Sequence, residues 1–161
     1  MIIKKAPNFK LISTSNATIE LHKFKSKFVV LYFYPKDDTP GCTLETQDFN
    51  LLLNKFKKNN CYIFGISKDD LKSHLKFKKK YKVKFDLLVD EKKEAIKAYK
   101  VWGKKKFLGV EFMGLIRSTF LIKDSKIIKE WRSVKVKGHA KEVLNFIENY
   151  NSKNLDILYI I

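Results

Sequence analysis

Two continuous apolar runs separated by one amphipathic segment constrain the fold of this chain most strongly. Residues 28–34 and 61–66 are almost wholly apolar or aromatic, as expected of strands buried on both faces of a sheet. Between them an apolar set recurs at helical spacing, namely Phe49, Leu52, Leu53 and Phe56. The pattern predicts a helix over about residues 42–57. A strand, a helix and a strand in this order form a β-α-β unit with parallel strands and a right-handed crossover.

The remaining segments predict a second, antiparallel part of the same sheet. Two short apolar stretches around a polar turn predict an N-terminal β-hairpin, and a basic helix to about Tyr81 follows the second buried strand. The other expected elements are a strand over 85–89, a helix over 91–100, a hairpin over 118–122 and 126–131, and a closing helix to about Tyr150. We therefore predict an α/β chain with a thioredoxin-like fold, in which helices lie on both faces of a central mixed sheet.

Length and composition favour one domain. The chain has 161 residues, of which 45% are hydrophobic, enough for one core and too few for two. We expect a single domain over 1–161 with a core over about 6–150. Residues 151–161 form a tail that is polar and then apolar, and too short to span a bilayer. The sequence leaves open whether the tail covers the domain or a partner subunit.

The net charge of +17 raises the question of a nucleic-acid or membrane partner. Only two of the 34 basic residues are arginine, Arg117 and Arg132, and the lysines are scattered along the chain. Because nucleic-acid surfaces usually draw on arginine for bidentate contacts, we expect a solvated lysine coat and no specific nucleic-acid partner. The scarcity of arginine suggests that each one present needs a planar, permanently charged group.

One thiol lies where a nucleophile would be activated. Pro35, Pro40 and Gly41 end the first buried strand, and Thr39 is expected to be the N-cap of the following helix with Pro40 at its first position. Cys42 then falls in the first helical turn. There, unpaired backbone N–H groups and the positive end of the helix dipole favour the reactive thiolate.

Cysteine and hydropathy patterns limit the class of protein further. Two cysteines are too few for a secreted disulfide framework, and neither His-rich nor C-x-x-C spacing occurs, so we expect no metal. The N-terminal residues show no targeting segment and no apolar run is long enough to cross a membrane. We expect a cytoplasmic protein without a membrane partner.

From about Ala6 to Ala140 the chain resembles the peroxiredoxins, specifically the bacterioferritin comigratory protein or peroxiredoxin Q subfamily. The family motif P-x-x-x-T-x-x-C stands here as Pro35, Thr39 and Cys42, and its T-P-G-C-T-x-E form continues to Glu45. A second family segment runs over 99–103 and 114–122 and contains Arg117. Several separated residues agree in type and order, which makes the match specific.

The resemblance implies a role for each of these residues. Cys42 would attack the peroxide O–O bond and become a sulfenic acid, Thr39 would bind a peroxide oxygen, and Arg117 would hold the thiolate and polarise the bond. Backbone N–H groups near Gly41 would complete the pocket, which Pro35 and Pro40 would shape. Glu45 would orient the helix turn or Arg117. No prosthetic group is implied.

Other roles for these residues stay open on sequence alone. Thr39 could act only as an N-cap, Arg117 could be a surface cation, and Glu45 could simply favour a helix N-terminus. His22, His74 and His139 lie far apart in the sequence and receive no role.

The second cysteine departs from the subfamily pattern. Many members carry a resolving cysteine five residues after the reactive one, where this chain has Gln47, and others carry it on the next helix, which has none here. Cys61 begins the strand after the helix. A helix of about 15 residues spans roughly 22 Å, whereas bridged Cα atoms lie within about 7 Å. We therefore expect Cys61 to be a buried apolar residue and the protein to be a one-cysteine peroxiredoxin.

The sequence thus favours a thiol peroxidase acting on hydrogen peroxide and organic hydroperoxides. An external thiol, from thioredoxin, glutaredoxin or a small molecule, would recycle it, and the chain would be a monomer or a homodimer. Two alternatives remain: a thioredoxin-fold adaptor without peroxidase activity, and a thiol-disulfide exchanger, which the missing C-x-x-C disfavours.

Overall fold

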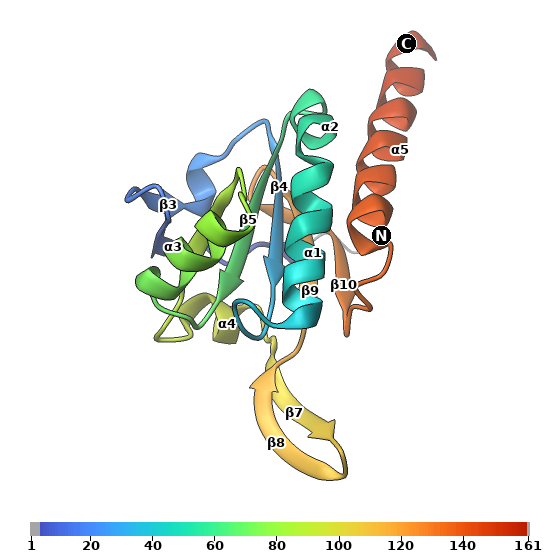
Figure 1. Ribbon diagram of the computed structural model, residues 1–161. Coiled ribbons are helices and arrows are strands. Elements are labelled where there is room, and N and C mark those ends of the chain that lie inside the picture. Colours follow the sequence, from blue (N-terminus) through green and yellow to red (C-terminus); the bar gives the residue numbers. More distant parts are fainter. Residues whose placement is uncertain (1–3, 161) are drawn as a thin grey trace.

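A six-stranded mixed sheet organises the molecule, which is described here from a computed structural model over residues 4–160. In Figure 1 strands of this sheet lie side by side behind helices. Its strand order is β1-β10-β9-β4-β5-β6. The strands span Lys4–Lys5 (β1), Phe28–Phe33 (β4), Cys61–Ser67 (β5), Asp86–Val89 (β6), Ser118–Lys123 (β9) and Lys126–Arg132 (β10). β4, β5 and β6 are parallel, whereas β9, β10 and β1 join by antiparallel pairing, which confirms the predicted mixed sheet.

Strand β4 lies in the middle of the sheet and separates two cores. All six of its residues are buried. Because successive side chains alternate between the faces, Val30 and Tyr32 pack with one set of helices while Leu31 and Phe33 face the other side. The continuous apolar run is therefore explained by burial on both faces.

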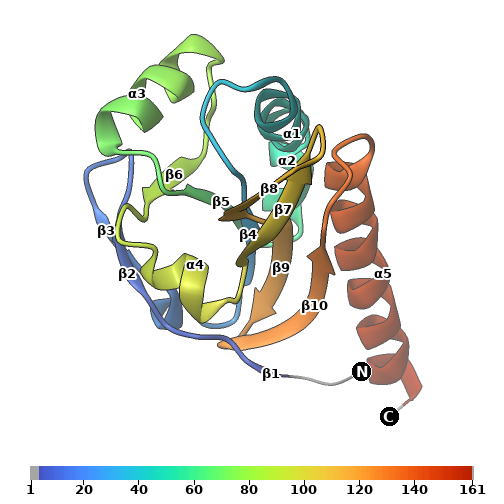
Figure 2. The same ribbon diagram turned by 90° about the horizontal axis from the view of Figure 1, so that it is seen from below.

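Helices cover both faces, as predicted (Figure 2). The first core includes side chains of α1 (Pro40–Leu51), α2 (Leu53–Lys58), α3 (Leu71–Lys80) and α5 (His139–Ile160). On the second face lie α4 (Glu94–Ala98), the 3-10 helix η1 (Leu21–Lys23) and the edge of the small β2–β3 sheet (Lys10–Ile12 and Thr18–Glu20). The N-terminal hairpin predicted from the sequence is thus present.

Three helical boundaries differ from the prediction. The helix expected over 42–57 is two helices, because Leu52 leaves α-helical geometry (φ −92°, ψ 2°). The helix expected over 91–100 is only the five-residue α4, which begins after Lys93 in left-handed geometry. The segment called a tail continues α5 as helix to Ile160, since neither glycine nor proline interrupts it. Residue 161 lies outside the described residues.

The longest segment that the sequence patterns missed is a β-hairpin. Strands β7 (Trp102–Phe107) and β8 (Val110–Leu115) form an antiparallel hairpin that projects from the body beside the N-terminus of α1 (Figure 1). Its turn contains Gly109 at φ +80°, a conformation that glycine adopts without a steric penalty. The hairpin leads directly to Arg117.

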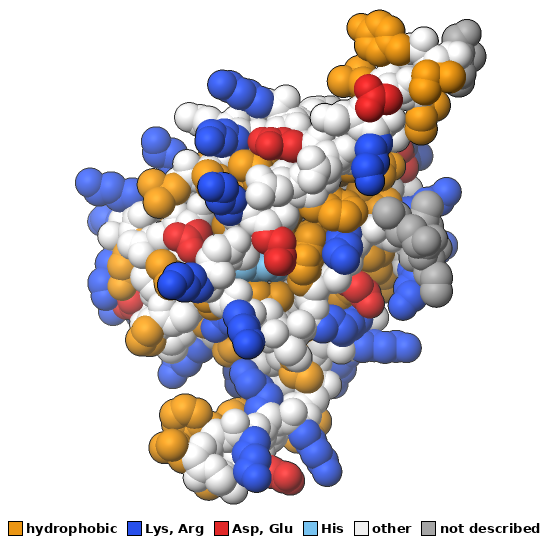
Figure 3. Space-filling view, turned by 90° about the vertical axis from the view of Figure 1, so that its right-hand side faces the viewer, with side chains coloured by type: hydrophobic (Ala, Val, Ile, Leu, Met, Phe, Trp, Pro, Cys, Tyr) orange, Lys and Arg blue, Asp and Glu red, His pale blue; other side chains and the backbone are white. Residues whose placement is uncertain are grey.

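The surface view matches a dispersed basic coat. Lys and Arg side chains are spread over the face in Figure 3 rather than gathered in one patch. Apolar side chains gather at two projections, the β7–β8 turn with Phe107 and Leu108 and the end of α5 with Leu158 and Tyr159. Within residues 4–160, none of the helices has the length and apolar character needed to cross a membrane.

Candidate active site

Cys42 lies in the first turn of α1, at the carboxyl end of β4. Thr39 precedes the helix with extended backbone angles (φ −96°, ψ 155°), and Pro40 occupies the first helical position, as predicted. The Thr39 side chain does not cap the helix; its hydroxyl donates instead to the carbonyl of Lys36 at 2.8 Å. The Cys42 side chain is almost fully buried, with 1% of its surface exposed. The helix terminus therefore presents a thiol beside unpaired backbone N–H groups.

Arg117 reaches Cys42 from a distant part of the chain. Ser118 at the start of β9 pairs with Phe33 at the end of β4, and this register brings the preceding residue to the N-terminus of α1. The Arg117 Nη2 atom lies 3.4 Å from the Cys42 Sγ atom. An arginine at this position is a permanently charged partner for a thiolate.

Glu45 holds the other side of the same guanidinium. Its Oε1 atom accepts a hydrogen bond from Arg117 Nη1 at 2.8 Å, from one turn along α1. Burial raises the pKa of Glu45 to about 7, and the charge of Arg117 opposes that rise. The Oε2 atom is buried without a hydrogen-bond partner, which makes the charged carboxylate costly. The carboxyl group thus fixes the direction of Arg117 and is itself poised to take a proton.

Gly41 leaves the space that Arg117 occupies. A Cβ atom at this position would lie 3.1 Å from Arg117 Nη2, tighter than ordinary contacts. Pro35 is half-buried in the loop after β4, and Pro40 is exposed. The structure therefore gathers Cys42, Arg117, Glu45 and Gly41 by direct contact, and places Thr39 and the two prolines in the loop and helix start that carry them.

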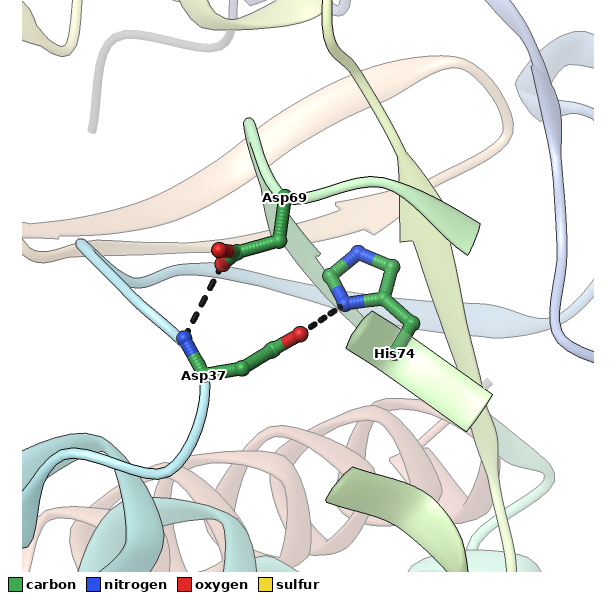
Figure 4. A group of neighbouring side chains, drawn as sticks. All are labelled: Asp37, Asp69 and His74. Atoms are coloured by element: carbon green, nitrogen blue, oxygen red, sulfur yellow. Dashed lines mark hydrogen bonds and ion pairs between the residues drawn. The ribbon is translucent and has the colours of Figure 1, made fainter. Parts of the chain in front are cut away.

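Sequence patterns missed a buried network that anchors this loop. Asp37, two residues before Thr39, accepts from Tyr34 Oη at 2.6 Å and lies 2.7 Å from His74 Nδ1 on α3 (Figure 4). Its backbone N–H donates to Asp69 at 2.9 Å. The loop that precedes Cys42 is therefore tied to α3 and to the end of β5.

The protonation of the His74–Asp37 pair follows from its partners. His74 Nε2 lies 2.9 Å from the Leu88 carbonyl oxygen, which can only accept, so this nitrogen donates. The 2.7 Å contact to Asp37 then requires one further proton between the imidazole and the carboxylate. Asp37, Asp69 and His74 place possible ligand atoms within 4.8 Å of one another, but hydrogen bonds within the protein already engage those atoms. No local sequence signal links His74 to Asp37.

Cys61 has different surroundings. It pairs with Phe28 at the amino end of β4, whereas Cys42 follows the carboxyl end of that strand. The side chain is buried, as predicted, and burial raises the pKa of its thiol. Its Sγ atom lies 3.4 Å from the Tyr62 carbonyl oxygen, and both cysteines are free. No cationic group is among the causes of its shifted pKa.

Comparison with known proteins assigns this arrangement to a family. The AhpC/TSA family model matches residues 2–131. Peroxiredoxin Bcp of Bacillus subtilis is 45% identical over 151 residues, covering 93% of this chain and 96% of the relative. A putative peroxiredoxin bcp of Helicobacter pylori is 46% identical, covering 86% and 92%.

Solved structures agree with the sequence relatives. A PrxQ mutant from Xylella fastidiosa superposes with a TM-score of 0.87 at 38% identity, covering 94% of this chain and 98% of that one. The bacterioferritin comigratory protein of Xanthomonas campestris, described with alkyl peroxide reduction activity, gives a TM-score of 0.83 at 37% identity over 88% and 91% of the two chains. The chain therefore belongs to the AhpC/TSA family and is a peroxiredoxin of the Bcp/PrxQ group, a thiol-dependent peroxidase.

Proposed function

We propose that the protein reduces hydrogen peroxide and organic hydroperoxides through a sulfenic acid on Cys42, and that an external thiol recycles it. The observation that carries this proposal is the 3.4 Å contact between Arg117 Nη2 and Cys42 Sγ at a helix N-terminus. A buried thiol with a permanent cation and open backbone N–H groups favours the thiolate, which is the nucleophilic form.

The reaction assigns one task to each group. The Cys42 thiolate attacks one peroxide oxygen, the O–O bond breaks, and the leaving alkoxide or hydroxide takes a proton to become an alcohol or water. Arg117 stabilises the negative charge as it moves from sulfur to the leaving oxygen, and Glu45 keeps the guanidinium aimed at that position.

Thr39 is suited to accept a hydrogen bond from the peroxide. Its hydroxyl proton is already donated to the Lys36 carbonyl at 2.8 Å, so the oxygen lone pairs remain available to an O–H of the substrate. The amides of the first helical turn add donors that no intrahelical carbonyl satisfies. Pro35 and Pro40 set the backbone path that presents these groups.

Recycling follows a one-cysteine scheme. One external thiol displaces water from the sulfenic acid to form a mixed disulfide, and a second thiol releases Cys42 as it forms an external disulfide. Cys61 lies at the other end of β4, so it is not placed to resolve the sulfenic acid within the folded domain. Recycling by cellular thiols suits the cytoplasm, and the scheme requires no prosthetic group.

The test is turnover with one reductant at a time. Peroxide removal should continue over many cycles with at least one of thioredoxin, glutaredoxin or a small thiol, and should stop after one equivalent without reductant. A chain that consumes no peroxide in a single turnover would favour the non-peroxidase adaptor. Disulfide exchange without peroxide consumption would favour the exchanger.

A further inference from the structure

The β7–β8 hairpin presents one apolar face and one charged face. Residues paired across antiparallel strands direct their side chains to the same face, and successive residues along a strand alternate between faces. The register pairs Phe107 with Val110 and Lys106 with Glu111. The apolar face therefore holds Phe107, Val110 and Phe112, with Lys105 nearer the body. The charged face holds Lys104, Lys106 and Glu111, together with Met113.

The apolar residues at the tip of this hairpin are exposed to solvent. The exposed fraction is 68% for Phe107, 87% for Leu108 and 64% for Val110. In the part of the chain that the structure describes, β7 and β8 pair only with each other, and they project from the body (Figure 1). Antiparallel strands with one apolar face commonly pack that face on a core. Here that face is available to a partner.

The end of α5 is a second exposed apolar projection, but its charge differs. Leu158 and Tyr159 are as exposed as the hairpin tip. Residues 102–115 carry three lysines and one glutamate, a net charge of +2, whereas residues 151–160 carry one lysine and one aspartate, which cancel. The two projections lie at opposite ends of the molecule (Figure 1). Of the two, the hairpin combines an apolar tip with positive charge, and Figure 3 shows basic side chains beside it.

The charge and the shape of the hairpin favour an anionic, deformable occupant. A second copy of this chain is disfavoured, because two hairpins of like charge would meet and each chain carries a net charge of +17. A standard protein interface uses roughly 20 to 30 residues a side. The hairpin, residues 102–115, instead offers a narrow projecting tip. Such a tip suits a lipid surface, into which apolar side chains can enter between headgroups.

The spacing of lysines behind the tip fits the thickness of a lipid headgroup layer. A strand rises about 3.3 Å per residue, so Lys106 lies about 3 Å and Lys104 about 10 Å behind Phe107. Interfacial segments bury their apolar face roughly 5 to 10 Å into the boundary between headgroups and acyl chains. When the tip is inserted, the lysines therefore lie at the level of the lipid phosphates, which their long side chains can reach.

We propose that the β7–β8 hairpin is a docking element for an anionic lipid surface. Phe107, Leu108 and Val110 enter the interface, and the lysines of the run 104–106 contact the phosphates. Docking is peripheral and reversible, and it does not depend on the peroxidase function proposed above. The expectation of no membrane partner rested on scattered lysines and on the lack of a long apolar run. It did not consider this hairpin, which the sequence patterns missed.

The test measures the partition of the full chain onto vesicles by flotation. The vesicles consist of phosphatidylcholine alone or of phosphatidylcholine mixed with the anionic phosphatidylglycerol. One hairpin variant combines Phe107→Ser with Leu108→Ser and removes the apolar tip. The other combines Lys104→Gln with Lys106→Gln and removes two charges. Wild-type protein is measured at low and at high salt.

Two matched controls change the same kinds of residue elsewhere. Leu158→Ser with Tyr159→Ser removes equally exposed apolar side chains from the end of α5. Lys57→Gln with Lys58→Gln removes two exposed charges from α2. These controls separate the hairpin from the general effect of exposed apolar residues and of the lysine coat.

Wild-type protein should bind the anionic vesicles at least about tenfold more tightly than the neutral ones, because each lysine near an anionic surface contributes about fivefold. High salt should weaken this binding. The tip variant should lose at least about tenfold in affinity. The charge variant should also lose at least about tenfold. Both controls should stay within about threefold of the wild type, because their positions do not face the bilayer when the hairpin is inserted.

A second readout reports insertion directly. The fluorescence of a Leu108→Trp variant should shift to shorter wavelength with anionic vesicles, whereas that of Leu158→Trp should not. Peroxide consumption in solution should be the same for the tip variant and the wild type, because Phe107 and Leu108 lie at the other end of the hairpin from Arg117. This measurement also shows that the tip variant is folded.

Equal vesicle binding by the wild type and the tip variant would overturn the proposal, since the lysine coat alone would then explain it. Absence of binding by the wild type would overturn it as well. In that case, a dimer that the tip variant abolishes, measured by light scattering, would identify a second copy as the occupant. Slower recycling of the tip variant by a protein thiol, but not by a small thiol, would identify an acidic protein instead.

Discussion

The two cysteines lie at opposite ends of one β-α-β unit and are buried to nearly the same extent, with 1% of Cys42 and 4% of Cys61 exposed. Both side chains belong to the same core on one face of the sheet, but their polar neighbours differ. Cys42 lies in a helix terminus beside a guanidinium, whereas Cys61 begins a strand and its Sγ contacts a backbone carbonyl. On the function proposed above, burial alone therefore does not decide whether a thiol is reactive. The charges and dipoles that share its pocket do.

The difference follows from the topology of the sheet. Loops after the carboxyl ends of parallel strands meet at one edge, where the loop after β4 and the β8–β9 connection bring Cys42 and Arg117 together. At the opposite edge the chain enters β5 through the turn that contains Asn60, whose carbonyl accepts from the Phe28 amide at the start of β4. Within residues 4–160, the hydrogen bond found for the Cys61 Sγ atom at that end is to the backbone carbonyl of Tyr62.

The strongest challenge to this comparison is to remove each sulfur in turn. Cys42→Ser should abolish peroxide consumption, because a serine hydroxyl at this position is not ionised at neutral pH. Cys61→Ser should retain most of the activity, because Cys61 lies at the opposite end of β4 from Cys42 and Arg117. Peroxide consumption in single turnover, with each variant checked for folding, measures both. Equal losses would contradict the assignment.

A smaller effect on peroxide reduction is expected when Arg117, the cation beside Cys42, is replaced by lysine. Arg117→Lys keeps the charge but cannot supply two fixed donors to Cys42 and Glu45 together. Loss of one such donor commonly costs on the order of a hundredfold in rate, or about 3 kcal/mol. The measurement is stopped-flow oxidation of Cys42, with Arg132→Lys on the neighbouring strand as control. Equal rates for Arg117→Lys and the wild type would show that the guanidinium group of Arg117 is not needed for peroxide reduction.

Glu45 should make the free energy of unfolding of the protein depend on pH. Its folded-state pKa is raised from 4.5 to about 7, so the folded protein holds a proton that the unfolded chain has lost. The stabilisation is fully present below about pH 4.5 and is lost as pH rises through about 7, by at most about 3 kcal/mol. Denaturant unfolding across this range should show the fall, and Glu45→Gln should flatten it. The same slope in both proteins would refute the assignment.

The buried contact between Asp37 and His74 holds the loop that precedes Cys42. Breaking it should affect the free energy of unfolding more than the rate of peroxide reduction. Asp37→Asn removes the carboxylate that pairs with buried His74, and should lower the free energy of unfolding by about 1 to 2 kcal/mol. Asp38→Asn is the matched control, because Asp38 is exposed and its ion pair with Lys80 lies at the surface. Urea unfolding of the two variants makes the comparison. A larger loss from Asp38→Asn would show that the buried network does not hold the loop.

Sequence patterns correctly predicted the elements that are determined by a few neighbouring residues. The run 28–34 became β4 because both faces of that strand are buried, and Pro40 opened α1 because its missing N–H costs nothing there. The β7–β8 hairpin was missed because Lys104, Lys105 and Lys106 interrupt the apolar alternation that identifies a strand.

The candidate site divides in the same way. Cys42 and Thr39 follow from one contiguous motif, and Arg117 was found only through the resemblance to a family. His74 could not be found, because its partner Asp37 lies 37 residues away in the sequence and reaches it only through tertiary packing.

The most direct test of the contrast between the two thiols is to map the product of one peroxide turnover by mass spectrometry. Wild-type protein is treated with one equivalent of hydrogen peroxide in the presence of a sulfenic-acid trap, then digested under conditions that preserve disulfides. The predicted result is a trapped sulfenic acid on Cys42, an unmodified Cys61 and no bridge between them. A Cys42–Cys61 disulfide as the main product, or a trapped sulfenic acid on Cys61, would contradict the account.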